Sequence, residues 1–116
     1  MSKADRTDRI ALLGELMDRY NAQDTEAYAA FFTPDGCEAA YRGPVLRDGQ
    51  FGIRDGYAKV FAEHPHNRAE VIDIREYSDQ VVVREKVMRS PEAEPFEVMA
   101  IYSFDNDKIS RVEFVR

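Results

Sequence analysis

The sequence predicts an α+β fold in which a cone-shaped, curved sheet of mixed or antiparallel strands packs against three N-terminal helices. Apolar residues repeat at helical spacing in the first half of the chain. β-Branched and aromatic residues dominate the second half, where short polar turns separate strand-like segments. Helices first and antiparallel strands last is the pattern of a layered α+β domain. At 116 residues, the chain is expected to form one domain over residues 1–116.

The first predicted helix spans residues 5–22. Its apolar side chains recur every three to four residues, so one face of the helix is expected to pack on the sheet. These side chains are Ile10, Leu13, Met17 and Tyr20, with Leu12 and Leu16 widening the stripe.

A short second helix is predicted over residues 25–32, because Asp24 is a favourable N-cap just before it. A Pro-Asp-Gly turn at residues 34–36 is expected to end it. Residues 37–42 then have the composition of a strand, and residues 43–49 that of a loop.

The third predicted helix spans residues 50–63 and stops at His64-Pro65. Gly56 is unfavourable in a helix interior, so its presence indicates close packing or space left beside the helix. Four strands are predicted after this helix, at residues 69–77, 80–89, 95–105 and 108–116. The tight turns between the first two and between the last two predict antiparallel pairs.

Composition excludes several classes of function. The net charge of −6, without a basic cluster, disfavours nucleic-acid binding. The single cysteine, Cys37, allows no internal disulfide and is expected to be a small buried residue. His64 and His66 lack a third ligand, so no metal or other cofactor is predicted. With neither a signal peptide nor a membrane span in the sequence, we expect a cytoplasmic protein that does not bind membranes.

The segment 24–57 resembles the superfamily of nuclear transport factor 2, ketosteroid isomerase and the SnoaL-like polyketide cyclases. The positions that match the pattern are Asp24, Phe31, Phe32, Asp35, Gly49, Ile53 and Tyr57. The resemblance implies the cystatin-like, nuclear transport factor 2-like fold, a pocket inside the cone and a homodimer.

The resemblance does not extend to the isomerase's chemistry, which uses an Asp base and an oxyanion hole of Tyr and protonated Asp. Leu16, Ala40 and Ala100 stand at the three matching positions. Leu and Ala can neither accept a proton nor donate a hydrogen bond, so ketosteroid isomerisation by that route is rejected. The third-helix Tyr that supports this network in the family matches Tyr57.

The same substitutions predict an apolar centre for the cone, which is either a ligand cavity or a solidly packed core. If it is hollow, the strand alternation and the resemblance predict a common set of lining residues. They are Leu16, Phe32, Ala40, Tyr57, Phe61, Val98, Ala100, Tyr102, Phe114 and Arg116.

Glu85 is the first candidate for chemistry, because it interrupts the apolar alternation of Val81, Val83 and Val87. On an inward face, desolvation would raise its pKa toward the range of a general acid or base. The alternative is an ion pair with an arginine of a neighbouring strand or a position at the rim.

Asp73 is a second candidate acid or base, and Tyr57 or Tyr102 is a candidate hydrogen-bond donor to the substrate. Asp73 alternates with Ile72 and Ile74, which is also the plain pattern of a half-buried strand. The resemblance also implies a possible functional pair of Asp73 with Arg84 or Arg111, because Asp–Arg pairs recur in epoxide hydrolases of this superfamily.

Glu38 and Arg42 fall on the Ala40 face by alternation, where they could place charge at the mouth of a pocket. The favoured alternative is a surface pair.

A homodimer is predicted because some strands carry apolar residues on both faces, leaving one set for a partner. Three functional classes stay open. They are an isomerase, cyclase or hydrolase of a small apolar carbonyl, epoxide or polyketide-like substrate, a non-catalytic ligand-binding protein, and a protein-interaction module.

Overall fold

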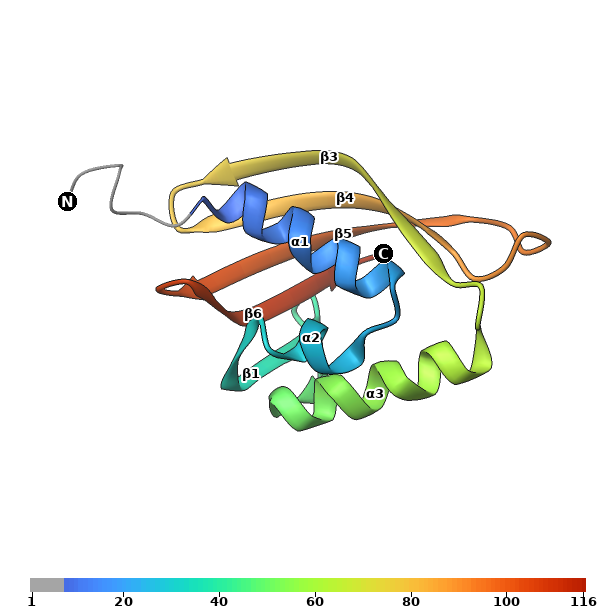
Figure 1. The fold of residues 1–116 in the computed structure, drawn as a ribbon. Coiled ribbons are helices and arrows are strands. Elements are labelled where there is room, and N and C mark those ends of the chain that lie inside the picture. The colour runs from blue at the N-terminus through green and yellow to red at the C-terminus, as the bar shows by residue number, and fades with distance from the viewer. Residues whose placement is uncertain (1–7) are drawn as a thin grey trace.

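The computed structural model describes residues 8–116, and it confirms the predicted α+β architecture. Three helices lie on one side of a curved sheet (Figure 1). The chain runs α1 (Arg9–Asn21), α2 (Thr25–Ala29), β1 (Phe32–Ala40), β2 (Val45–Asp48), α3 (Gly49–Glu63), β3 (Arg68–Tyr77), β4 (Gln80–Met88), β5 (Phe96–Asp105) and β6 (Lys108–Val115). None of the helices within residues 8–116 is long and apolar enough to cross a membrane.

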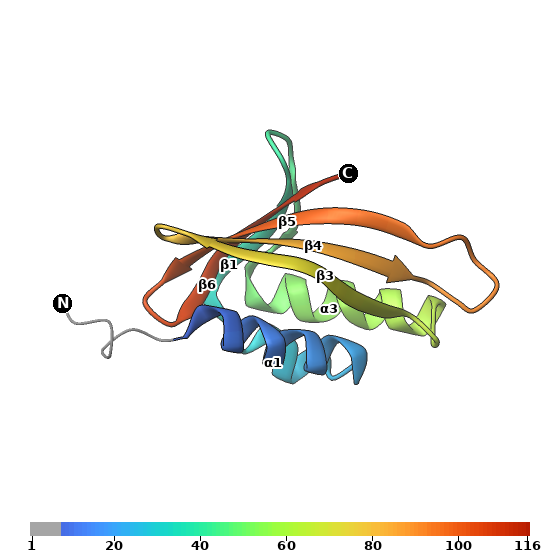
Figure 2. The same ribbon diagram turned by 90° about the horizontal axis from the view of Figure 1, so that it is seen from above.

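The six strands form one mixed, open sheet in the order β2-β1-β6-β5-β4-β3. β1 and β6 are parallel, and every other neighbouring pair is antiparallel. Figure 2 shows α1 and α3 on the concave side of the curved sheet. α1 packs against β3 and α3 against β1, and α2 contacts both of these helices.

The helix caps explain where α1 and α2 begin. The Asp8 carboxylate accepts a hydrogen bond from the Ala11 amide at 3.1 Å, and Asp24 caps α2 through the Ala27 amide at 3.1 Å. The predicted Asp24 cap is therefore confirmed. Residues 5–7, which the sequence placed in the first helix, lie outside the described residues.

Two predictions about this part of the chain were wrong: the second helix does not extend to residue 32, and residues 34–36 do not form the turn that ends it. α2 ends at Ala29, and β1 begins at Phe32, because Phe32 pairs with Ile109 of β6. The Pro-Asp-Gly segment then lies inside β1, at an irregularity of the pairing with β6 between Phe32 and Cys37. Pairing with β2 starts only at Cys37, so no partner on that side needs the amide hydrogen that proline lacks.

The predicted loop at residues 43–49 contains β2, which pairs with β1. β2 has only four residues, of which Val45 and Leu46 are exposed, so its sequence has no alternation to detect. It nevertheless positions Arg47 directly opposite Glu38 of β1.

The core lies between the helices and the inner face of the sheet. Its fully buried members include Leu16, Phe32, Ile53, Ala100 and Val112. The two predicted tight turns are confirmed, since β3 pairs with β4 and β5 with β6 in antiparallel register.

Candidate functional site

A buried carboxylate on β1 organises the polar part of the site. Glu38 is 0% exposed and is contacted by groups from three other elements. Tyr28 of α2 and Tyr57 of α3 donate their hydroxyl hydrogens to Glu38 Oε2 at 3.0 and 3.1 Å. Arg47 of β2 donates through Nε to Glu38 Oε1 and forms an ion pair with it. The carboxylate is thus fully satisfied, as a buried charge must be.

The predicted surface pair of Glu38 with Arg42 is therefore wrong. The cause is a β-bulge at Glu38 and Ala39, where the register with β2 shifts. Residues 36–39 are all buried in succession, so period-two alternation fails at this point of the strand. Arg42 lies beyond the strand, exposed and with a positive φ of 56°.

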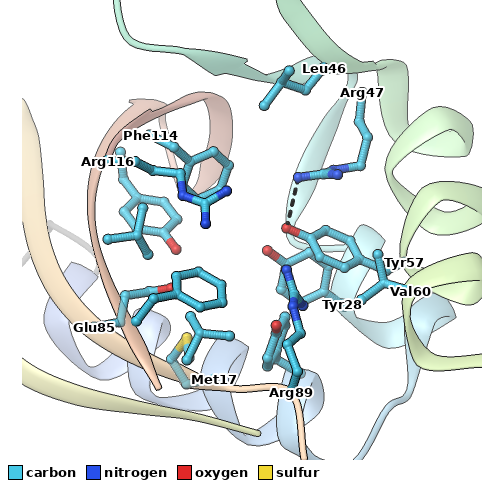
Figure 3. A pocket seen from close by; sticks show the side chains of 15 residues that line it. Met17, Tyr28, Leu46, Arg47, Tyr57, Val60, Glu85, Arg89, Phe114 and Arg116 are labelled. Carbon is cyan, nitrogen blue, oxygen red and sulfur yellow. Dashed lines mark hydrogen bonds between the residues drawn. The ribbon is translucent and has the colours of Figure 1, made fainter. Parts of the chain in front are cut away.

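Arg47 reaches Glu38 because Gly56 leaves room for its side chain. A Cβ atom at Gly56 would lie 2.6 Å from Arg47 Cδ, well inside contact distance. The guanidinium carbon lies 4.5 Å from the Tyr57 ring centroid, and Nη2 donates to the Tyr57 hydroxyl at 3.3 Å (Figure 3). The glycine in the middle of α3 is thus explained by close packing.

Glu85 lies on the inner face of β4, between buried valines, which is the inward one of the two alternatives that the sequence left open. It forms no ion pair with any residue in the described part of the chain, and its buried Oε2 has no hydrogen-bond partner there. Desolvation, with a smaller contribution from the charge of Glu38, raises the pKa of Glu85 to about 7. Glu85 is consequently a carboxyl group that both gives and takes protons near neutral pH.

Glu85 and the three residues that bind Glu38, namely Tyr28, Arg47 and Tyr57, line one cavity of about 120 Å³ (Figure 3). That is close to the volume of about 150 Å³ that accepts a benzene molecule in an engineered cavity. The lining residues are Met17, Tyr20, Tyr28, Leu46, Arg47, Tyr57, Val60, Glu85, Val87, Arg89, Phe96, Val98, Tyr102, Phe114 and Arg116.

Four tyrosines line this cavity and supply hydroxyl groups. Burial, aided by the charge of Glu38, raises the pKa values of Tyr28 and Tyr57 well above the usual 10. Burial and the charge of Glu85 do the same for the pKa of Tyr102. These hydroxyls stay protonated at neutral pH and act as hydrogen-bond donors. Within residues 8–116, the Tyr28 and Tyr57 donors are used by Glu38, whereas no bond occupies the Tyr102 hydroxyl.

A second hollow of about 200 Å³ lies between α1 and the strands β3 and β4. It is lined by aliphatic side chains together with Gly14 and the Tyr102 ring, and no carboxylate, arginine or histidine lines it. Although larger, it offers no acid, base or charged group for chemistry. The cavity that contains Glu85 is therefore the better candidate site.

Half of the predicted lining residues line the cavity. They are Tyr57, Val98, Tyr102, Phe114 and Arg116. Leu16, Phe32, Phe61 and Ala100 are buried in the surrounding core and do not line it, and half-buried Ala40 lies at the end of β1. Leu16, Phe32, Phe61 and Ala100 instead belong to the closely packed hydrophobic core around the cavity.

Asp73 does not lie near the cavity. It is exposed on β3, 3.2 Å from Arg75 Nε, and its cross-strand neighbour is Arg84. Cys37 is buried, as predicted. His64 forms the C-cap of α3, also as predicted. No group of three His, Cys, Asp or Glu residues able to hold a metal occurs within residues 8–116.

Sequence reasoning missed Arg47, Arg89 and the role of Glu38. Arg89 is the last residue of the strand predicted at residues 80–89, and nothing in the sequence connects it with Asn67, which lies beyond the predicted end of the third helix. In the structure, Arg89 Nη1 donates to Asn67 Oδ1 at 2.8 Å. Asn67 is 1% exposed, and its amide donates to the Tyr20 hydroxyl at 2.7 Å. Asn67 and Arg89 lie just outside β3 and β4, and a polar residue beside a strand end is only a weak signal; Glu38 and Arg47 lie within strands and have no such signal.

Comparison with known proteins supports the fold and the family. A family model described as a SnoaL-like domain matches residues 13–112. The chain is 48% identical to an uncharacterized cystatin fold protein from Novosphingobium aromaticivorans, with 87% of this chain and 92% of that chain covered and a TM-score of 0.82. No curated protein matches it.

Two more distant solved structures share the fold. One is a candidate polyketide cyclase from Sinorhizobium meliloti, with 22% identity, coverage of 99% of this chain and 100% of that chain, and a TM-score of 0.76. The other is a protein with a ketosteroid isomerase-like fold from Catenulispora acidiphila, in complex with trimethylamine. Its sequence is 13% identical to this chain, the match covers 86% of this chain and 80% of that chain, and the TM-score is 0.71.

Proposed function

This chain belongs to the SnoaL-like domain family, and we propose that it binds a small, mainly apolar carbonyl compound and transfers a proton at the carbon beside the carbonyl group. The observation that carries this proposal is the Glu85 carboxylate, whose Oε2 is buried without a hydrogen-bond partner among residues 8–116 at the wall of a cavity. A pKa of about 7 supports the role, because a general base works best near the ambient pH.

The proposed step needs only residues of the cavity. Ionised Glu85 removes the proton from the α-carbon, and the electron pair of the broken C–H bond moves onto the carbonyl oxygen. The Tyr102 hydroxyl donates a hydrogen bond to that developing enolate. Glu85 then returns the proton to carbon or oxygen. Isomerisation and aldol cyclisation both begin with this proton removal.

Tyr57 takes a positioning role in this scheme. Its hydroxyl hydrogen is donated to Glu38, and its oxygen accepts from Arg47, so the group is engaged on both sides. Tyr102 lines the same cavity as Glu85, and no residue of the described part of the chain occupies its hydroxyl, whose pKa is raised by burial and by the charge of Glu85. We therefore assign the donor role to Tyr102.

Deuterium exchange tests the proposal without a known product. Ketones of about the size of a benzene ring are incubated with the protein in D₂O, and the loss of their α-proton signal is followed by NMR. Glu85→Gln is expected to slow the enzyme-dependent exchange by about 10²- to 10⁴-fold, because the amide cannot act as a base. Glu97→Gln, which removes an exposed carboxylate of β5, is the matched control and should exchange at the wild-type rate. Equal rates in wild type and Glu85→Gln would eliminate Glu85 as the base.

A binding protein without chemistry is the second candidate. It is favoured by Leu16 and Ala100, which are fully buried apolar residues at two positions where the isomerase pattern has its oxyanion donors. Tight binding of a ketone without any exchange above the buffer rate would support this function and reject proton transfer.

We also propose that the protein is a cytoplasmic homodimer formed through the outer face of the sheet. Ile72 of β3 and Met99 of β5 are both 41% exposed, and neither is covered by a helix. A monomer of this size gains stability when such apolar side chains pair with a second copy. Light scattering after size exclusion should give twice the chain mass of 13.3 kDa at micromolar concentration. A mass of one chain would reject the dimer.

A further inference from the structure

We propose that the ligand of this cavity carries an anionic group of the carboxylate class, bound by Arg89 and Arg116 of its lining. The inference rests on the proposed function and narrows its substrate to a ring-sized carbonyl compound with an acid group. Both arginines line the cavity, and their labelled side chains extend toward its centre in Figure 3.

Arg89 is held in place from behind by a buried network. Its Nη1 donates to Asn67 Oδ1, and the Asn67 amide donates to Tyr20 on α1. Because Asn67 is almost fully buried, this contact fixes one corner of a planar guanidinium group. A guanidinium carries five N–H donors, so most of them stay available to an anion in the cavity.

The guanidinium groups of Arg116 and Arg89 both form cation–π contacts with the ring of Phe96. Their guanidinium carbons lie 4.5 and 5.3 Å from the centroid of Phe96. Two like charges on one ring repel each other, and the cation–π contacts offset this only in part. An anion between or beside the two guanidinium groups would remove that repulsion.

Neither arginine has a carboxylate partner among residues 8–116, in contrast to Arg47, which pairs with Glu38. The contrast matters because the chain has 22 acidic and 16 basic residues, so two arginines without a carboxylate partner at one cavity differ in sign from the net charge of the protein. A cavity of this kind attracts small anions and repels cations. Val98 and Phe114 provide the apolar surface for the ligand's ring.

The arrangement orients the ligand. With the acid group at Arg89 and Arg116 and the ring against the apolar wall, the carbon that reacts faces the Glu85 and Tyr102 side of the cavity. The remote charge would then hold the substrate where the proton is removed, which is how binding away from the reaction centre accelerates a reaction.

Paired ligands test the inference directly. Phenylacetate and benzoate are titrated against phenylacetamide and benzamide by calorimetry at low salt. We expect wild type to bind each carboxylate about tenfold or more tightly than its amide. Arg116→Met should abolish this preference and should leave the fold intact, because Arg116 is exposed. Arg89→Met should do the same, although it also removes a partner of buried Asn67, so its fold is checked by circular dichroism.

Arg75→Met is the matched control, since Arg75 is an exposed β3 arginine paired with Asp73. It should keep the wild-type preference for carboxylates. Equal binding of acid and amide to wild type would overturn the inference while leaving the proposed proton transfer standing. Carboxylate preference together with the absence of deuterium exchange would reject the chemistry and keep the anion site. Failure of all four ligands to bind would overturn the inference.

Discussion

Replacing Glu38 with alanine is expected to lower the free energy of unfolding by roughly 3–5 kcal/mol, the largest effect of any single substitution in this site. The substitution leaves the Arg47 guanidinium without its counter-ion and two buried tyrosine hydroxyls without their acceptor. It also opens a hole where a fully buried side chain stood. Urea unfolding followed by circular dichroism measures the loss.

A double-mutant cycle separates charge from packing. Glu38→Gln keeps the shape and leaves Arg47 unpaired, and Arg47→Met leaves a buried carboxylate unpaired. We expect each to be strongly destabilising, and the double variant to be more stable than the sum of the single losses predicts. The exposed Arg84–Glu97 pair, at 2.7 Å, is the control and should show little coupling. Additive losses at Glu38 and Arg47 would contradict the ion pair's role in the fold.

Raising the pH from 4.5 to 8 is expected to destabilise the wild-type protein through Glu85. Folding raises the pKa of Glu85 from its ordinary value of 4.5 to about 7, so the folded state binds its proton more tightly than the unfolded state does. The stability that this proton provides is complete below pH 4.5 and is lost as pH rises to about 7. At about 1.4 kcal/mol for each pH unit between the two values, the loss is roughly 3 kcal/mol.

Glu85→Gln should remove this pH dependence, because the amide stays neutral throughout. The variant is therefore expected to match wild type near pH 4.5 and to be more stable by roughly 2–3 kcal/mol at pH 8. Chemical unfolding at a series of pH values measures both curves. Glu97→Gln, on an exposed surface, should follow the wild-type curve. A Glu85→Gln curve parallel to wild type would show that Glu85 is not protonated in the folded protein near neutral pH.

If Glu85→Gln is more stable than wild type at pH 8 and no longer catalyses deuterium exchange, the result would indicate that Glu85 is retained for chemistry and not for stability. A buried carboxylate oxygen without a hydrogen-bond partner among residues 8–116, as in Glu85, lowers the stability of the folded protein. A residue that lowers folding stability in this way is typically one retained for chemistry.

The fold and the position of Glu85 could be predicted from the sequence because both follow from regular periodicity. Burial alternates along all nine residues of β4, and Val81, Val83 and Val87 mark one face of the strand, so Glu85 could be recognised as a candidate for the inward face. The resemblance over residues 24–57 indicated the family for a similar reason, since the chain matches it there without a gap.

Glu38 and Arg47 could not be predicted because they depend on irregular structure. The bulge at Glu38 and Ala39 places consecutive residues in the interior, and no composition signal marks it. Arg47 lies on a strand of four residues whose neighbours are exposed. Its partner could be known only after the register between β1 and β2 was fixed.

The tyrosines of the cavity have a spectroscopic consequence. The chain has no Trp and six Tyr, and four of these, Tyr20, Tyr28, Tyr57 and Tyr102, line the cavity. Tyr57 lies edge-on to Tyr28 and Tyr20, with ring centroids 4.9 and 5.7 Å apart. The near-ultraviolet absorption, circular dichroism and intrinsic fluorescence of this protein therefore originate mainly from the walls of one cavity. A ligand that enters it changes these signals without any attached label, so occupancy can be read optically in the native chain.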